Sequence, residues 1–216
     1  PPVCGILQRM SPLLNAVRLS RSFHGRQVVE PLDLQLAAGD ILGLLGPNGA
    51  GKTTIMRMLC GDLAPSGGQV EISGADLALR PLEAKRYLGY LPERPPLHRD
   101  QTVDEYLSDC AALHGLGRAA RRSALPATKR RCGLEAVGRR LIRKLSKGYQ
   151  QRVGLAQAII HDPRVVILDE PTDGLDPAQI RQVRELIRSL AERDPRHLHP
   201  GDDPAAGAHR LQWRYR

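Results

Sequence analysis

The sequence predicts an α/β fold, and three observations support this prediction. Residues 46–54 read Gly-Pro-Asn-Gly-Ala-Gly-Lys-Thr-Thr, the glycine-rich pattern of a phosphate-binding loop. An apolar run at 41–45 precedes this loop and a helical run at 54–59 follows it, which is the strand–loop–helix context that the pattern requires. Residues 165–168 read Val-Val-Ile-Leu, which is typical of a buried parallel strand. The 216 residues suit one such domain with a real core.

The elements follow from hydrophobic periodicity and from the turn residues between them. We expect strands wherever apolar runs or alternating leucines are bounded by Gly, Pro, Ser or Asp, at 13–19, 28–36, 41–45, 69–72, 87–91 and 165–168. Thr102 and Glu105 form a capping-box pattern that predicts a helix through Leu113. Further helices are predicted in the basic region that follows, after Gly148, and from about Ala178 to Leu190.

The phosphate-binding loop carries the first chemistry. Glycines let the backbone curl so that successive amide hydrogens point at a polyphosphate, and the positive end of the next helix faces the same anion. Lys52 would reach the β and γ phosphates, and the Thr53 hydroxyl would ligate Mg²⁺. We therefore expect ATP to be held by the loop residues Gly46, Pro47, Asn48, Gly49, Ala50, Gly51, Lys52, Thr53 and Thr54.

Two carboxylates stand at the end of the predicted buried strand. Asp169 at that position can hold the Mg²⁺ of a bound triphosphate, and Glu170 can polarise an attacking water. By itself, an apolar run ending in Asp-Glu is also common for purely structural reasons. Its place downstream of a phosphate-binding loop favours the catalytic interpretation.

Composition narrows the possible partners. No apolar run of about 18 residues is present, so no segment is predicted to cross a membrane. Four scattered cysteines without a CxxC pair argue against a zinc site and for a reducing cytosol. Much of the net charge of +9 falls between Arg118 and Lys144, whereas aromatic residues make up only 3% of the chain. We interpret this basic stretch as a solvated helical face near a membrane or partner, and we expect no nucleic acid.

Residues 145–152, Leu-Ser-Lys-Gly-Tyr-Gln-Gln-Arg, add a family resemblance. A Ser and a Gly at a helix N-terminus form another anion-binding arrangement. Lying between the phosphate loop and the carboxylates, the segment resembles the signature motif of ATP-binding cassette (ABC) ATPases. Residues 171–177 similarly resemble that family's D-loop, with Asp176 as its aspartate.

Two further positions match the family less closely. Residues 89–93 resemble the Q-loop segment, with Glu93 in place of the usual glutamine, as in cassettes of ABC-2-type and gliding-motility-like exporters. Phe23 stands where the family places an aromatic that stacks on adenine. It could equally be an ordinary core aromatic.

The resemblance covers residues 13–193 and implies a RecA-like P-loop NTPase core, an antiparallel β-subdomain, and a helical subdomain at about 100–160. It implies ATP and Mg²⁺ as cofactors, Mg²⁺ held by Thr53 and Asp169, and Glu170 as general base. It also implies a head-to-tail pair of cassettes, in which the partner's ATP is contacted by the signature residues Ser146, Lys147, Gly148, Tyr149 and Gln150.

The same resemblance implies a role in transport. Such a cassette powers export through a separate membrane permease, docked near Glu93, and lies in the cytoplasm on the inner face of the plasma membrane. The competing interpretations are a soluble cassette ATPase that acts on ribosomes or DNA, and an inactive gene remnant. The transported substrate is selected by the permease and is not readable here.

The chain departs from the family pattern near Asp194. A strand is expected at about 194–199, followed by a switch histidine, but residues 194–204 contain three prolines, a Gly and an Asp pair, which cannot form a buried parallel strand. We therefore expect that the last core strands are missing, that 194–216 is an unstructured, truncated or out-of-frame tail, and that turnover is slow. Residues 1–12 are expected to be a disordered or non-native extension, because Met10 is the first methionine.

Overall fold

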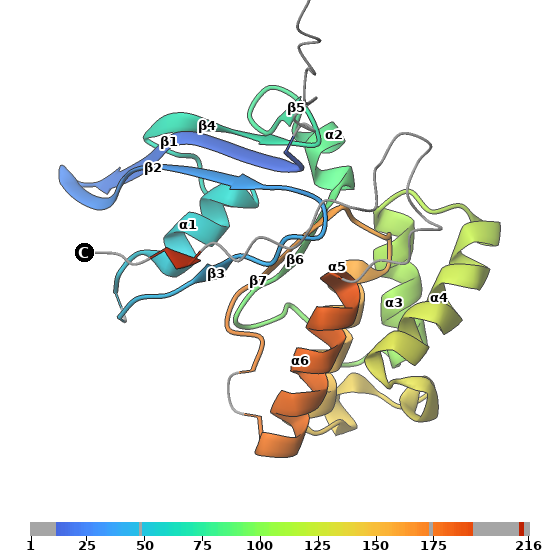
Figure 1. Ribbon diagram of the computed structural model, residues 1–216. Coiled ribbons are helices and arrows are strands. Elements are labelled where there is room, and N and C mark those ends of the chain that lie inside the picture. The colour runs from blue at the N-terminus through green and yellow to red at the C-terminus, as the bar shows by residue number, and fades with distance from the viewer. Residues whose placement is uncertain (1–11, 48, 173–174, 192–211, 214–216) are drawn as a thin grey trace, which may run out of the picture.

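The computed structural model describes residues 12–47, 49–172, 175–191 and 212–213. Within these residues the fold is mixed α/β, as predicted, with the antiparallel sheet and the first helix on one side and the later helices on the other (Figure 1). Two hydrophobic clusters hold it together. One lies between the antiparallel sheet, α1 (Lys52–Leu59) and the parallel strands, and the other lies among the later helices.

The predicted antiparallel subdomain is a four-stranded sheet in the order β2-β1-β4-β5. It comprises β1 (Leu14–Phe23), β2 (Arg26–Leu36), β4 (Gly67–Ile72) and β5 (Ala75–Asp76). Leu14 pairs with Leu36 on one side and with Ile72 on the other, so β1 is central. Leu14, Leu19 and Ile72 are fully buried on the face of this sheet that packs against α1.

The phosphate loop lies beneath this sheet, between β3 (Gly43–Leu44) and α1 (Lys52–Leu59). Ile55, Met58 and Leu59 bury one face of α1, as a helical spacing of three and four residues requires. A short helix, α2 (Pro81–Arg86), then leads into β6 (Leu88–Leu91).

Parallel pairing sets the position of the carboxylates. β6 pairs in parallel with β7 (Val165–Leu168), with Leu88 opposite Val165 and Leu91 opposite Leu168. Asp169 follows directly, and its backbone N–H donates to the Leu91 carbonyl at 2.9 Å, which extends the ladder by one residue. The carboxylate therefore stands at the carboxyl end of the strand, the edge at which ligands bind in open α/β sheets.

The helical part contains α3 (Val103–Leu113), α4 (Arg118–Cys132) and α5 (Lys147–Ile159), joined by the short 3-10 turns η1 (Glu135–Val137) and η2 (Ile142–Lys144). The predicted capping box opens α3: Thr102 Oγ1 accepts from the Glu105 N–H at 3.3 Å, and a Glu105 oxygen accepts from the Thr102 N–H at 2.8 Å. The helix predicted from Ala178 is α6 (Pro177–Ala191).

The C-terminal part differs from our expectation at two residues. We expected 194–216 to be unstructured and the last core strands to be missing, yet Gln212–Trp213 form a short strand, β8, parallel to β3. Parallel ladder hydrogen bonds explain this pairing, because the backbone of Gly43 and Leu44 offers donors and acceptors at an edge. The other residues of 194–216, with His197, His199 and His209, lie outside the described residues, as do residues 1–11.

Among the described residues, no helix is long and apolar enough to cross a bilayer.

Candidate functional site

The phosphate loop depends on a glycine at its last turn. Gly51 has φ +84°, in the left-handed region that side chains rarely adopt. A Cβ added there would lie 3.1 Å from the Val28 carbonyl oxygen, closer than an ordinary contact. The loop therefore turns into α1 directly against the backbone of β2. Of the nine predicted loop residues, Asn48 lies outside the described part.

The Lys52 side chain folds back over the loop. Its ammonium donates to the carbonyl oxygens of Gly46 at 2.8 Å and of Pro47 at 3.0 Å. Gly46, Pro47 and Gly49 are exposed, so the loop and its cation are open to solvent. A phosphate brought to this loop would meet a positive charge that is already held in place by the loop itself.

The start of α1 is open to an anion. Its N-cap, Gly51, provides no side-chain acceptor, and the first turn contains no acidic residue. The first amides of a helix have no intrahelical acceptor and carry the positive end of the dipole. The backbone N–H groups of Lys52, Thr53 and Thr54 can thus donate to phosphate oxygens, so this helix start suits a polyphosphate.

Thr53 and Asp169, distant in sequence, meet here. The Thr53 hydroxyl lies 3.5 Å from Asp169 Oδ1, at the junction of α1 with the end of β7. Asp169 is only 2% exposed, and no cationic side chain among the described residues pairs with it. A buried carboxylate without a counter-charge is costly. Hydroxyl and carboxylate oxygens suit Mg²⁺, so the donor set fits this ion.

The Asp169 carboxylate contributes to the raised pKa values of two neighbours, Tyr90 and Cys60. Burial, and after it the charges of Cys60 and Asp169, raise the pKa of Tyr90 to about 12. Burial is also the main cause that raises the pKa of the Cys60 thiol, with Asp62 next. Both groups are therefore neutral near pH 7.

Glu170 lies in a strained backbone position. Its φ is +46°, in the left-handed region, although it is not a glycine. Its side chain is exposed, in contrast to the buried Asp169 beside it. Such conformations are concentrated at functional sites, where the surrounding structure fixes them. The turn at Glu170 places the two consecutive carboxylates in different environments, one buried and one open to water.

The signature residues cap α5. Ser146 is its N-cap, and Ser146 Oγ accepts from the Tyr149 N–H at 3.4 Å. Gly148 is buried and lies against the end of the Gln179 side chain, which would have to move if Gly148 carried a side chain. Gln179 is a neighbour that sequence reasoning missed, because nothing in its local pattern marks it.

The remaining predicted residues occupy separate places. Asp176 Oδ1 accepts from the Ala178 and Gln179 N–H groups, both at 2.9 Å, so this residue is the N-cap of α6. An Asp followed by Pro is a start signal that predicts this role from sequence. Glu93 is exposed in the segment after β6.

Phe23 is not a core aromatic. It ends β1 with 38% of its surface exposed, and the Arg21 guanidinium lies 4.5 Å from its ring centroid. The core alternative is therefore wrong, because residues of the core here are below one-tenth exposed. An exposed ring with one face covered by a cation remains available for stacking on a planar base.

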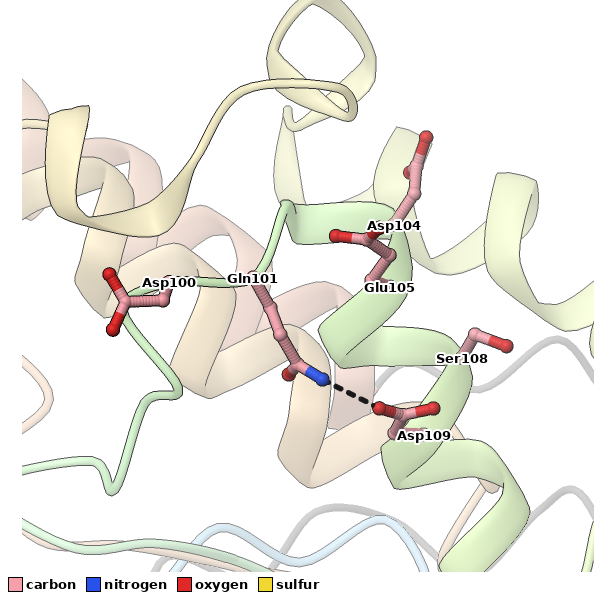
Figure 2. A pocket seen from close by; sticks show the side chains of 6 residues that line it. All are labelled: Asp100, Gln101, Asp104, Glu105, Ser108 and Asp109. Carbon is pink, nitrogen blue, oxygen red and sulfur yellow. Dashed lines mark hydrogen bonds between the residues drawn. The ribbon is translucent and has the colours of Figure 1, made fainter.

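A hollow lies away from this site, in the helical part. About 590 Å³ in volume, it opens at the start of α3 and is lined by acidic, amide and hydroxyl side chains (Figure 2): Asp100, Gln101, Asp104, Glu105, Ser108 and Asp109. Gln101 Nε2 donates to Asp109 Oδ2 at 2.8 Å across it. An acidic lining repels a triphosphate, so we assign nucleotide chemistry to the phosphate loop and not to this hollow.

The loop, the uncapped helix and the facing hydroxyl–carboxylate pair define a P-loop nucleotide-binding protein. A family model described as ABC transporter matches residues 29–173, which include the phosphate loop, the signature segment and both carboxylates. The chain belongs to the ABC transporter family and carries its ATP-binding domain.

Individual relatives of this chain are also ATP-binding proteins of transport systems. The bacitracin transport ATP-binding protein BcrA of Bacillus licheniformis is 38% identical over 183 residues, 85% of this chain and 59% of the relative. The Nod factor export ATP-binding protein I of Paraburkholderia xenovorans is 38% identical over 176 residues, 82% of this chain and 58% of the relative. This chain thus spans about three-fifths of the length of these relatives.

A solved structure supports the fold. The ATP binding subunit of an ABC transporter superposes with a TM-score of 0.75 at 32% identity, over 83% of this chain and 75% of that one.

Proposed function

We propose that this chain is the ATP-binding and ATP-hydrolysing subunit of an exporter. The observation that carries the proposal is the meeting of the Thr53 hydroxyl with the buried Asp169 carboxylate, 3.5 Å apart, beside a loop already covered by Lys52. A hydroxyl, a carboxylate and an ammonium are the groups that a Mg²⁺–triphosphate complex requires at this point.

Each residue has a distinct task in this proposal. The first amides of α1 and the Lys52 ammonium bind the phosphates, with Lys52 exchanging its carbonyl acceptors for phosphate oxygens. Thr53 and Asp169 would hold Mg²⁺, which supplies charge neutralisation between the β and γ phosphates. The exposed Glu170 carboxylate accepts a proton from the attacking water. The strained turn aims it outward, whereas Asp169 stays buried.

A second copy completes the site in our proposal. The N-terminus of α5, capped by Ser146, presents amides and a hydroxyl to the γ-phosphate bound by the other copy. Binding of ATP would thereby hold two cassettes head to tail, and hydrolysis would release them. The Asp176 cap fixes the start of α6 beside Gly148, so the D-loop aspartate also supports the signature helix.

A separate membrane permease would convert the ATP-driven pairing of the two cassettes into transport. The relatives named above are described as ATP-binding proteins of bacitracin transport and of Nod factor export, which favours export. We propose that the permease docks near Glu93 and the helical part. The chain would then lie on the cytoplasmic face of the plasma membrane.

The proposal is tested by phosphate release from the purified chain at saturating Mg²⁺ and ATP. We expect slow hydrolysis, because the sequence of residues 194–204, with three prolines, a Gly and an Asp pair, departs from the family's strand-and-histidine pattern. Glu170→Gln should abolish it and should trap an ATP-dependent dimer, visible by size-exclusion chromatography with light scattering. Hydrolysis that survives Glu170→Gln would contradict the assigned base.

Two other functions remain as alternatives. A soluble cassette ATPase acting on ribosomes or DNA is favoured only by the charge of +9. Co-sedimentation with ribosomes would support it, whereas a neighbouring gene for a polytopic membrane protein would support the exporter. An inactive gene remnant predicts no nucleotide binding at all.

A further inference from the structure

Many of the basic side chains that lie outside the nucleotide site fall within one stretch of the helical part. Residues 115–144 contain ten Lys or Arg residues and one acidic residue, Glu135. This stretch includes α4, the 3-10 turns η1 and η2, and the segments between them. Net positive charge of this density attracts an extended anionic partner.

The fold leaves one side of α4 uncovered. Thr128 and Cys132 are buried, and Ala124 and Leu125 pack beside them against the helical core, so this side faces inward. The opposite side is open, and α4 lies at the outer edge of the molecule (Figure 1). Four arginines of α4 are exposed: Arg118 and Arg122 near its start, and Arg130 and Arg131 near its end, where they also line a hollow shared with α6.

Few of these cations are neutralised. Lys129 Nζ lies 2.6 Å from Asp104 Oδ1, and Arg143 Nη1 lies 3.0 Å from Asp100 Oδ1. These two pairs use carboxylates from the rim of the acidic hollow (Figure 2). In the described part of the chain, no carboxylate lies within ion-pair distance of the four exposed arginines of α4.

An apolar side chain stands at the start of this surface. Leu113, the last residue of α3, is 88% exposed and precedes the connection to α4. Exposed cations beside a protruding apolar side chain match an anionic interface with an apolar interior, as a bilayer offers.

Nucleic acid fits less well. Residues 115–144 contain no aromatic residue on which a base could stack, and Ser123 is their one exposed side chain of the hydroxyl or amide type. Aromatic rings are the platforms on which unpaired bases stack, and this stretch offers none. We therefore favour an anionic surface without bases as its partner.

We propose that the open side of α4, with Leu113 at its start, binds anionic phospholipid headgroups at the membrane surface. The arginines Arg118, Arg122, Arg130 and Arg131 provide the attraction, and Leu113 enters the apolar boundary. Binding of this kind holds the chain at the membrane independently of the permease. It requires neither ATP nor the phosphate loop.

The test is flotation of the full chain with vesicles of phosphatidylcholine and phosphatidylglycerol at about 7:3, against phosphatidylcholine alone. We expect binding to the anionic vesicles only, weakened by salt. The triple variant R118Q/R122Q/R130Q should bind at least about tenfold more weakly, since each basic residue near such a surface contributes roughly fivefold. The matched variant R181Q/R184Q/R188Q removes three exposed arginines from α6 and should change binding less than about twofold.

A second pair of variants separates insertion from charge. Leu113→Gln should weaken vesicle binding severalfold, whereas Leu82→Gln, at a leucine 82% exposed on α2, should not. Circular dichroism confirms that each variant is folded, and the salt dependence of the unaltered chain provides a readout if one is not. The proposal is overturned if the unaltered chain does not bind anionic vesicles, if the α6 variant loses as much binding as the α4 variant, or if single-stranded DNA or tRNA binds more tightly than the vesicles.

Discussion

The Thr53 hydroxyl donates toward Asp169 Oδ1 across 3.5 Å, although 116 residues separate the two in sequence. α1 places the first residue, and the parallel pairing of β6 with β7 places the second. Because Asp169 is buried without a cationic partner among the described residues, a metal ion entering this junction would stabilise it.

Asp169→Asn should therefore remove the effect of Mg²⁺ on nucleotide affinity. The amide has nearly the same shape but no charge, so ATP affinity with Mg²⁺ should fall about tenfold or more toward the value measured with EDTA. Titration of a fluorescent ATP analogue with and without Mg²⁺ measures this change. Asp109→Asn, made in the acidic hollow far from the loop, provides the control and should retain the full Mg²⁺ effect.

The turn at Gly51 should not accept a side chain. Gly51→Ala combines a φ of +84° with a Cβ only 3.1 Å from the Val28 carbonyl oxygen, so we expect a loss of about 2 to 3 kcal/mol in the free energy of unfolding. Urea denaturation measures it.

Gly25→Ala is the matched control, because Gly25 has a similar φ of +79° but nothing within 4 Å of an added Cβ. It should cost about 1 kcal/mol, the conformational part alone. Equal losses in the two variants would show that the contact with β2 does not shape the loop.

Two stacked histidines predict how stability depends on pH. His114 and His161 stack with centroids 3.5 Å apart, and His161 Nε2 donates to the Leu88 carbonyl at 3.0 Å. Burial, and after it His114, lowers the pKa of His161 from 6.5 to about 4, while the Leu88 carbonyl and Asp162 act in the opposite direction. Burial also lowers the pKa of His114.

The unfolded chain therefore binds more protons than the folded one between pH 6.5 and about 4. Stability should fall as the pH falls through that window, by about 2 kcal/mol after allowance for the partial exposure of the ring. His161→Gln can keep the hydrogen bond to Leu88 without titrating, so it should flatten this dependence. Urea unfolding at several pH values gives the free energy of unfolding of the unaltered chain and of the variant. The same pH dependence in both would refute the role of His161.

Local patterns predicted most of this molecule. The glycine spacing predicted the phosphate loop, the capping box predicted the start of α3, and the apolar run at 165–168 predicted β7. In each case the physical signal lies within a few consecutive residues. β5, with two residues, and α2, with six, were not predicted because neither is long enough to show a period.

Contacts between distant elements could not be predicted in the same way. The place of Gln179 against Gly148 and the stack of His114 on His161 depend on how whole helices pack. The exposed position of Phe23 likewise follows from its place at the end of β1, beside the turn into β2, since composition alone left a core position equally open. The family resemblance predicted that Thr53 and Asp169 meet, which no local pattern contains.

Calorimetric titration of the purified chain with Mg·ATP tests the central claim most directly. We predict binding at one site per chain, weakened at least about thirtyfold by Lys52→Ala because a charge-assisted contact to phosphate is lost, and unchanged by Lys144→Ala at an exposed lysine of η2. No binding to the folded chain, or equal binding by the Lys52 variant, would contradict the assignment of this loop as the nucleotide site.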